Sequence, residues 1–255
     1  MRRDPDLPDL TGTVALVTGA GGGIGSGIAL RFAAAGAAVV VGYRSSAGRA
    51  DAVVAQILGD GGRAAAVRAD VTGPEGCAAL VAAAVGGFGR LDAVVAAAGV
   101  QPVAEIAGTS VADWRGVVDT NLTGTFATVR AAAAAMTGGS ITVIASIEGG
   151  RPAPAHAHYA ASKAGVIMLA RSAALEFGPR GIRVNSVSPG LVARAGLDAE
   201  WPSGVARWRA TSPLGELVSA AEVGDACVFL ASPMARRITG HDLVVDGGMG
   251  VAPPW

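Results

Sequence analysis

The sequence has few charged side chains, and neither sign is in excess. Charged residues make up 16% of the 255 positions, and 20 basic side chains balance 20 acidic ones. A chain with this balance has no basic surface that would attract nucleic acid or an anionic membrane, so we expect neither as a partner. Hydrophobic residues, by contrast, reach 51%, which is enough to bury a sizeable core and argues against a disordered chain.

Cysteines and targeting signals are also scarce. Two cysteines, Cys77 and Cys227, are too few for a disulfide framework, and we interpret each as a small buried hydrophobic residue. The first eight residues are charged and interrupted by proline, without the apolar stretch of a signal peptide. Two uncharged windows, residues 11–30 and 131–147, are broken by glycine-containing segments, so neither predicts a membrane-spanning helix. We therefore expect a soluble, cytoplasmic protein.

Lysine, tyrosine and asparagine are nearly absent. Lys163 is the only lysine, tyrosine occurs at Tyr43 and Tyr159, and asparagine occurs at Asn121 and Asn185. Because arginine carries the other positive charges, we expect the remaining lysine where a compact ammonium group is needed. Lys163 follows Tyr159 by four residues, which places both side chains on one face of a helix. The two residues form either a reactive pair or an ordinary exposed pair one turn apart.

Short apolar runs alternate with helical patterns along the chain. The runs are apolar throughout, as in strands buried on both faces of a parallel sheet. Helical patterns between them predict βαβ crossovers, and no linker or change of composition divides the chain. We predict a single-domain α/β protein with a doubly wound, mostly parallel seven-stranded sheet flanked by helices. The predicted strands cover residues 13–18, 38–41, 64–67, 93–96, 141–144, 182–187 and 243–245.

Residues 191–215 are the exception to this alternation. They contain Trp201, Pro202, Ser203, Gly204 and Trp208 and follow neither a helical nor a strand pattern. An irregular insert of this length is usually a lid over a binding site. We predict a substrate lid here, with a packed surface loop as the alternative.

A glycine-rich turn joins the first predicted strand to the first helix. Residues 18–25 read Thr-Gly-Ala-Gly-Gly-Gly-Ile-Gly. Without side chains, the backbone can turn sharply, and a pyrophosphate can approach the free N–H groups at the start of the helix. In a βαβ series this placement predicts a dinucleotide-binding site, although the glycines could also form only a tight turn.

The glycine turn and later motifs resemble those of the short-chain dehydrogenase/reductase family over residues 10–248. Thr18 to Gly25 match the cofactor turn, and Asp70-Val71 match the pair that contacts adenine. Residues 185–190 match the segment beside the nicotinamide, and residues 245–248 match the C-terminal signature. The resemblance implies a Rossmann-type fold in which residues 10–100 mainly bind the dinucleotide and residues 101–248 hold the catalytic and substrate residues.

Asn121, Ser146, Tyr159 and Lys163 match the catalytic tetrad of the same family in order and spacing. The resemblance implies that Tyr159 exchanges a proton with the substrate and that Lys163 lowers the pKa of this tyrosine and holds the nicotinamide ribose. Ser146 would donate a hydrogen bond to the substrate oxygen, and Asn121 would anchor a water that links Lys163 to solvent. The cofactor would supply the hydride that turns a ketone into an alcohol.

The implied cofactor site departs from the family pattern in two places. Residues 96–99 read Ala-Ala-Ala-Gly where the family usually has Asn-Asn-Ala-Gly, and we expect the loss of the first asparagine to cost stability. The threonine that helps to hold the nicotinamide carboxamide falls on Ala193 or Arg194, which predicts weaker anchoring. The predicted cofactor-binding residues are Gly19, Gly21, Gly22, Gly23, Ile24, Tyr43, Arg44, Ser45, Asp70, Val71, Ala97, Ala98, Gly99, Tyr159, Lys163, Pro189, Gly190 and Val192.

The end of the second predicted strand bears on the choice between NAD and NADP. A site specific for NAD places an acidic side chain there, whereas this chain has Tyr43 followed by Arg44 and Ser45. A guanidinium binds phosphate through two hydrogen bonds, so we predict NADP(H) as the favoured cofactor, with NAD(H) as the alternative. Members that use NADP often carry a second basic residue in the glycine turn, where residues 20–22 are Ala-Gly-Gly. The alternative is that Arg44 is an exposed surface residue that binds no ligand.

The predicted substrate pocket is formed by Ser146, Glu148, Tyr159 and Trp201. Glu148 is placed there by resemblance, although a solvated loop carboxylate is the more common role for such a residue. Three histidines, His156, His158 and His241, lack a companion cluster of cysteines or carboxylates, so we predict no metal site. We interpret these histidines as pocket-rim or surface residues.

Three functions fit these residues. The leading prediction is an NADPH-dependent carbonyl reductase that interconverts a small ketone and a secondary alcohol. The first alternative is a 3-oxoacyl-[acyl-carrier-protein] reductase, but residues 131–139 after Arg130 are uncharged, whereas an acidic carrier protein needs basic docking residues. The second is a non-catalytic dinucleotide sensor, which would not need the tetrad. The resemblance also implies a homotetramer formed through helices at residues 111–135 and 157–177 and the C-terminal strand.

Overall fold

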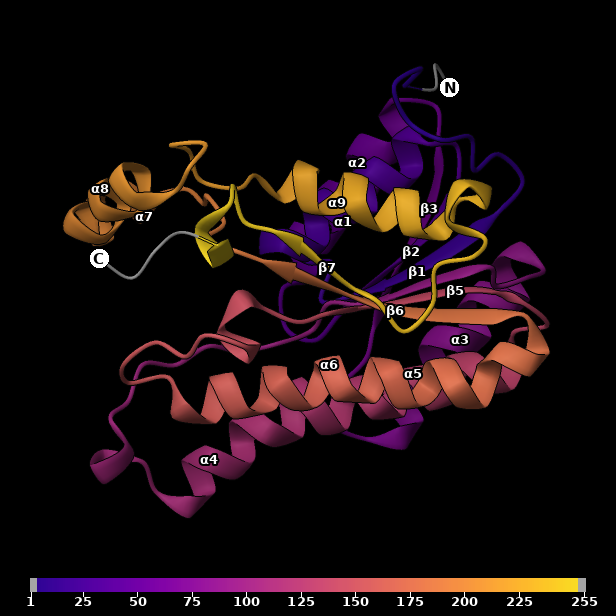
Figure 1. Cartoon of the computed structure of the whole chain (residues 1–255). Coiled ribbons are helices and arrows are strands. Elements are labelled where there is room, and N and C mark those ends of the chain that lie inside the picture. Colours follow the sequence, from indigo (N-terminus) through magenta and orange to yellow (C-terminus); the bar gives the residue numbers. More distant parts are fainter. Residues whose placement is uncertain (1–3, 252–255) are drawn as a thin grey trace.

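The centre of the molecule is a seven-stranded sheet in the order β3-β2-β1-β4-β5-β6-β7 (Figure 1). Our computed structural model describes residues 4–251. Residues 1–3, part of the segment for which we predicted no signal peptide, lie outside the described residues. Each strand pairing is parallel, which sharpens the prediction of a mostly parallel sheet. All seven predicted strands are present: β1 (Val14–Thr18), β2 (Ala38–Tyr43), β3 (Arg63–Arg68), β4 (Ala93–Ala96), β5 (Gly139–Ile144), β6 (Ile182–Pro189) and β7 (Asp242–Val245).

Helices cover both faces of the sheet (Figure 1). One layer consists of α1 (Gly23–Ala34), α2 (Ala47–Gly59) and α9 (Ala220–Ala231), and the other of α3 (Pro74–Phe88), α5 (Gly124–Ala135) and α6 (Ala157–Phe177). Neighbouring residues of β1 pack into different layers, with Val17 in the first core and Leu16 in the second. Because both faces are covered, all of β1 is buried, which explains why its sequence is an unbroken apolar run.

Two predictions about helical segments need correction. The helix predicted over residues 111–135 divides into α4 (Val111–Val118), a π-helical turn (Asp119–Thr123) and α5. Residues 191–215, predicted to be irregular, contain α7 (Leu197–Glu200) and α8 (Pro202–Thr211). Pro202 begins α8 at a position where its missing N–H is not needed, and Arg209 forms an ion pair at 3.2 Å with Asp198 of α7. Short helices of this composition leave no clear periodicity in the sequence.

The strand order reverses between β1 and β4, so the connections after these strands lead to opposite sides of the sheet. In open parallel sheets, ligands bind at the carboxyl ends of the strands at such a point. Here the glycine turn after β1 meets the loop after β4. The strand order therefore places the expected ligand site at the carboxyl ends of β1 and β4.

Both cysteines are buried and free, as predicted. Burial is the main cause that raises the pKa of the Cys77 and Cys227 thiols above the usual value. No helix within residues 4–251 has the length and apolar character that crossing a bilayer requires.

Candidate active site

The glycine turn packs directly against the loop that follows β4. Gly19 has φ of +67°, and a Cβ on this residue would lie 2.8 Å from the Cα of Ala98. Thr18 Oγ1 accepts hydrogen bonds from the backbone N–H groups of Ala97 at 3.0 Å and Ala98 at 3.1 Å. Thr18 thus joins β1 to the segment in which alanine replaces the family's asparagine.

A cavity of about 240 Å³ opens beside this contact. It is lined by Thr18, Gly19, Gly21, Gly22, Gly23, Gly42, Tyr43, Arg44, Ser45, Ser46, Arg49, Ala69, Asp70, Val71, Leu80, Ala98, Gly99, Val100 and Thr120. The structure therefore brings together most of the cofactor residues predicted from the first half of the chain. Of the other predicted cofactor residues, Ile24, Ala97 and Val192 pack against the hydrophobic core, and Pro189 ends β6.

The lining of this cavity fits an adenine dinucleotide. Glycines form one wall, where backbone N–H groups can approach a pyrophosphate closely. Asp70 lies on another part of the lining, and hydrogen bonds from the backbone N–H and the hydroxyl of Thr72 hold the pKa of this carboxyl below its usual value. A carboxylate that stays ionised can accept a hydrogen bond from the adenine amino group.

Ser146, Tyr159 and Lys163 come together at the carboxyl end of β5 and the first turns of α6. Ser146 follows β5 and is buried, and its Oγ accepts a 3.1 Å hydrogen bond from the backbone N–H of Glu148. Its hydroxyl also lies close enough to the Tyr159 side chain to act on the pKa of that phenol. Lys163 Nζ donates a 2.7 Å hydrogen bond to the carbonyl oxygen of Ile144 and lies 5.6 Å from the ring centroid of Tyr159. A Cβ on Gly99, which lines the dinucleotide cavity, would lie 3.6 Å from the same Nζ. The candidate catalytic cluster and the cavity are therefore adjacent.

Burial dominates the electrostatics of this cluster. Desolvation raises the pKa of Tyr159 to about 12; the Ser146 hydrogen bond opposes the rise, and the negative charge of Glu148 adds to it. Desolvation also lowers the pKa of Lys163 to about 8. The pKa of Tyr159 therefore lies above its usual value, not below it as expected, because burying a phenolate is costly. The Lys163 ammonium group is turned to the Ile144 carbonyl. Its role in lowering the pKa of Tyr159 stays a prediction.

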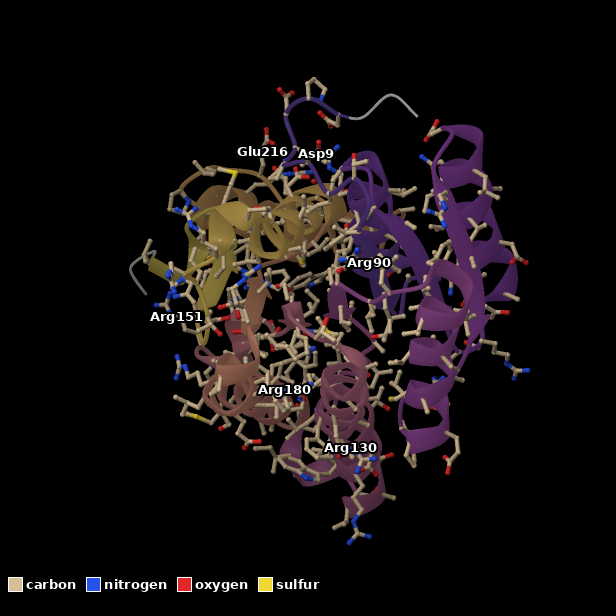
Figure 2. The ribbon with its side chains drawn as sticks, turned by 90° about the vertical axis from the view of Figure 1, so that its right-hand side faces the viewer. Asp9, Arg90, Arg130, Arg151, Arg180 and Glu216 are labelled. Carbon is tan, nitrogen blue, oxygen red and sulfur yellow. The ribbon has the colours of Figure 1, made fainter. Side chains whose placement is uncertain are left out.

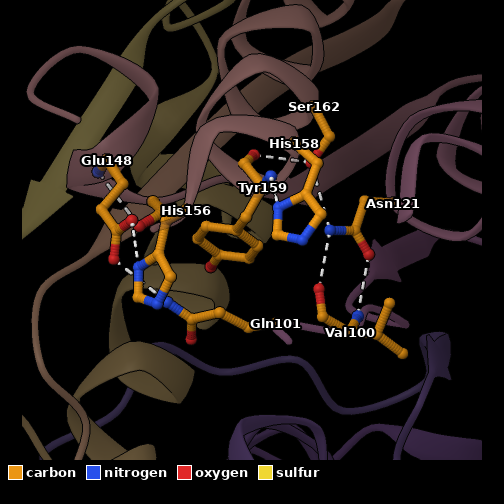
Figure 3. A network of polar contacts seen from close by, with 9 residues as sticks. Val100, Gln101, Asn121, Glu148, His156, His158, Tyr159 and Ser162 are labelled. Carbon is orange, nitrogen blue, oxygen red and sulfur yellow. Dashed lines mark hydrogen bonds and ion pairs between the residues drawn. The ribbon is translucent and has the colours of Figure 1, made fainter. Parts of the chain in front are cut away.

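Asn121 connects the loop after β4 to α6 (Figure 3). Its Oδ1 accepts from Val100 N at 2.8 Å, and its Nδ2 donates to Val100 O at 2.9 Å and to Ser162 Oγ at 3.1 Å. Ser162 Oγ in turn donates to the carbonyl oxygen of Tyr159 at 2.7 Å. Asn121 lies in the π-helical turn, and both N–H groups of its side chain are used in joining these segments. The predicted water contact of Asn121 remains a prediction.

Glu148 belongs to a hydrogen-bonded group beside Tyr159 rather than to solvent (Figure 3). Gln101 Nε2 donates to Glu148 Oε1 at 3.0 Å, and His156 donates from Nδ1 to Glu148 Oε2 at 2.9 Å. The His156 ring meets the Tyr159 ring edge-on, with 6.2 Å between centroids. The solvated role for Glu148 is thus wrong, and Gln101, which carried no motif signal, joins the site.

His158 is not the rim or surface residue that we expected. It is 1% exposed, and its Nδ1 accepts a hydrogen bond from the backbone N–H of Tyr159 at 2.9 Å. Within the described chain its Nε2 has no partner. His158 lies in the first turn of α6, one turn before Ser162, which is also buried. No three His, Cys, Asp or Glu side chains within residues 4–251 lie close enough to hold a metal ion.

The two tryptophans of the predicted lid occupy different positions. Trp208 packs over Gly190, where a Cβ would lie 2.7 Å from the indole Cζ2, and its Nε1 donates to Glu216 O at 3.2 Å. Trp201 is 45% exposed and packs on Gly204 within the same segment. Trp208 thus contacts the motif expected beside the nicotinamide, and the substrate-pocket role of Trp201 remains a prediction.

Known proteins match this chain along almost its whole length. The family model described as enoyl-(acyl carrier protein) reductase matches residues 19–250. A 3-oxoacyl-[acyl-carrier-protein] reductase from Synechocystis is 39% identical over 244 residues, which is 94% of this chain and 98% of the relative. A 3beta-hydroxysteroid dehydrogenase from Eggerthella lenta is 40% identical over 252 residues, 96% of each chain.

The fold is equally well matched among solved structures. A short-chain type dehydrogenase/reductase from Mycobacterium marinum superposes with a TM-score of 0.89 at 38% identity, covering 96% of this chain and 98% of that one. The sequence match and the fold match thus extend over the same residues as the dinucleotide cavity and the tetrad. The chain belongs to the short-chain dehydrogenase/reductase family and is an NAD(P)-dependent oxidoreductase that acts on CH–OH and C=O groups.

Proposed function

We propose that the protein is an NADPH-dependent carbonyl reductase that acts on a small ketone. The observation that carries the proposal is the cluster of buried Ser146 and Lys163 with half-buried Tyr159 next to the glycine-lined cavity. A bound nicotinamide dinucleotide would be held by the glycine turn and by Asp70 and would supply the hydride.

The protein's own side chains can supply the proton that the ketone oxygen needs to become an alcohol. The Ser146 hydroxyl can donate a hydrogen bond to the ketone oxygen as negative charge develops there. With a pKa of about 12, the Tyr159 phenol keeps its proton at neutral pH, so it can act as the acid that completes the alcohol. Lys163, with a pKa of about 8, can exchange a proton close to neutral pH and restore the phenol.

A cofactor-oxidation assay across ketones, aldoses and acyl thioesters tests the proposal. We expect NADPH oxidation with at least one small ketone and its loss in the Tyr159→Phe variant. Tight NADPH binding without turnover of any substrate would overturn the reductase and favour a non-catalytic sensor. The sensor is the weaker candidate because it would not need Ser146, Tyr159 and Lys163 to lie together.

NADP(H) preference is supported by the cavity's charge. Arg44 lines the cavity after Tyr43, at the position where an NAD site would carry an acidic side chain. The Arg44→Ala variant should raise the apparent Michaelis constant for NADPH about tenfold, the cost of one charge-assisted phosphate contact, and leave that for NADH nearly unchanged. A wild-type enzyme that prefers NADH would contradict this assignment.

A 3-oxoacyl-[acyl-carrier-protein] reductase is the second candidate, and one contact favours it. Arg180, which follows α6, donates to the carbonyl oxygen of Met136 at 3.0 Å and is exposed on the same side of the molecule as Arg130 (Figure 2). The end of α5 therefore has a positive charge that residues 131–139 alone did not predict. Faster turnover of a carrier-protein thioester than of a small ketone, lost in Arg180→Glu, would favour this candidate.

We also propose a homotetramer. α4, α5 and α6 lie on the same side of the sheet (Figure 1), and each exposes a large apolar side chain: Trp114, Phe126 and Leu175. Apolar patches of this kind commonly mark a protein–protein interface. Light scattering should give four times the chain mass, and a stable monomer at micromolar concentration would exclude the assembly.

A further inference from the structure

Arg49 reaches the glycine turn from outside it. It lies in the first turn of α2 and lines the same cavity as Arg44 and Ser45. A Cβ on Gly22 would lie 3.4 Å from Arg49 Nε and 3.5 Å from its Cζ. The guanidinium therefore occupies the space into which a side chain at position 22 would project.

This guanidinium is held in place without being neutralised. Arg49 Nη2 donates to Ser46 Oγ at 2.5 Å. Among residues 4–251, neither Arg44 nor Arg49 forms an ion pair within 4.0 Å. Asp70 is the acidic residue of the lining, and the charge of Arg44 contributes to its lowered pKa. The rim of the cavity thus carries two guanidinium groups and two serine hydroxyls against one carboxylate.

Such a rim matches a phosphate monoester better than a neutral ribose. A phosphate carries close to two negative charges at neutral pH and offers three acceptor oxygens, which two guanidinium groups can share. A ribose hydroxyl, which carries no charge, would leave both cations without an anionic ligand. The two arginines come from different elements, the end of β2 and the start of α2, so they can approach one group from two sides.

We propose that Arg49 is a specificity-determining residue that binds the 2′-phosphate of NADP together with Arg44. It takes the place of the basic residue that the glycine turn lacks, and it does so from α2. The inference rests on the proposed NADP preference and adds the second cation that this preference needs. Gly22 is then required to be small because a longer side chain would displace the Arg49 guanidinium.

Calorimetry with two nucleotide fragments tests the role of Arg49 without the reaction. Adenosine 2′,5′-bisphosphate and 5′-AMP differ only in the 2′-phosphate. We expect Arg49→Ala to weaken binding of the bisphosphate about tenfold and to leave 5′-AMP within about twofold. Arg49→Lys, which keeps the charge but loses the fork, should weaken it less. Arg237→Ala removes an exposed arginine outside the cavity lining and should change neither affinity.

The outcomes separate this inference from the proposed function. If the wild type binds both fragments equally, the NADP preference itself fails. If the wild type prefers the bisphosphate and Arg44→Ala loses that preference while Arg49→Ala keeps it, only the role of Arg49 fails. Equal weakening of both fragments by Arg49→Ala would also overturn the inference, because it would mean that Arg49 only shapes the turn through Ser46.

Discussion

Positive charge is used in different ways at the two ends of the site. Lys163 is 5% exposed, and burial lowers its pKa to about 8. Arg44 and Arg49, at the cavity rim, are exposed, and a guanidinium keeps its charge in either environment. Burial can therefore adjust an ammonium group to exchange a proton near neutral pH, whereas it cannot do so for arginine. Lys163, the one lysine among twenty basic residues, lies at the buried end of the site.

The largest effect should come from removing the acid at the buried end. Tyr159→Phe should lower kcat about a thousandfold or more because the proton donor is lost. The affinity for NADPH should stay within about twofold, since the cations at the rim are untouched. Stopped-flow turnover and a fluorescence titration of NADPH measure the two quantities. Substantial remaining turnover would show that the chemistry does not depend on the buried phenol.

The next effect tests whether the buried cation must be an ammonium. Lys163→Arg should lower kcat about a hundredfold because guanidinium does not release a proton near neutral pH. Lys163→Met, which carries no charge, is the matched comparison and should lose a similar amount. If the arginine variant keeps more than about a tenth of the wild-type kcat, the contrast between the two ends of the site is wrong.

Burying Lys163 should also make the free energy of unfolding depend on pH. In the unfolded chain this lysine is protonated up to about pH 10.5, whereas in the folded protein it loses its proton near pH 8. Between these values the unfolded state binds more protons, so stability rises with pH across this window, by up to about 3 kcal/mol. Denaturant unfolding of the wild type and Lys163→Met at pH 7, 8 and 10 measures it. A difference between the two proteins that does not change with pH would contradict the lowered pKa.

The smallest expected effect concerns Glu148, whose charge is a minor cause of the raised pKa of Tyr159. Glu148→Gln should move this pKa down by less than about one unit. Because tyrosine occurs only at positions 43 and 159, ultraviolet titration in a Tyr43→Phe background reports Tyr159 alone. Gln101→Leu, which removes a hydrogen bond but keeps the carboxylate charge, is the control and should leave the pKa closer to that of the parent.

Features carried by local sequence patterns could be predicted. The strands are unbroken apolar runs because both faces of the sheet are covered, and all seven predicted strands are present. The glycine turn and the Tyr159–Lys163 pair are likewise short motifs, each contained within a few residues of the sequence. These features predicted the cavity wall and the catalytic cluster before any distance was known.

Features that depend on packing between distant segments could not be predicted. Arg49 approaches Gly22, and Gln101 donates a hydrogen bond to Glu148, although no sequence motif or regular interval links the members of either pair. The pKa of Tyr159 rises rather than falls because the depth of burial is a property of the whole fold. Sequence motifs thus predicted which groups react, whereas the electrostatic environment of these groups required the structure.

The position of β1 in the sheet has a consequence for how the chain folds. Val14 pairs with Ala38 across one intervening helix, α1, whereas Ala15 pairs with Ala93 across three, α1, α2 and α3. Closing the longer loop costs more chain entropy, so we expect β4 to join after the unit of β1, α1 and β2 has formed. The contact of Gly19 with Ala98, and with it the cavity, is complete only after that step. Nucleotide binding can then precede the docking of β5 and α6, and a ligand present during synthesis would stabilise the growing chain before it can catalyse a reaction.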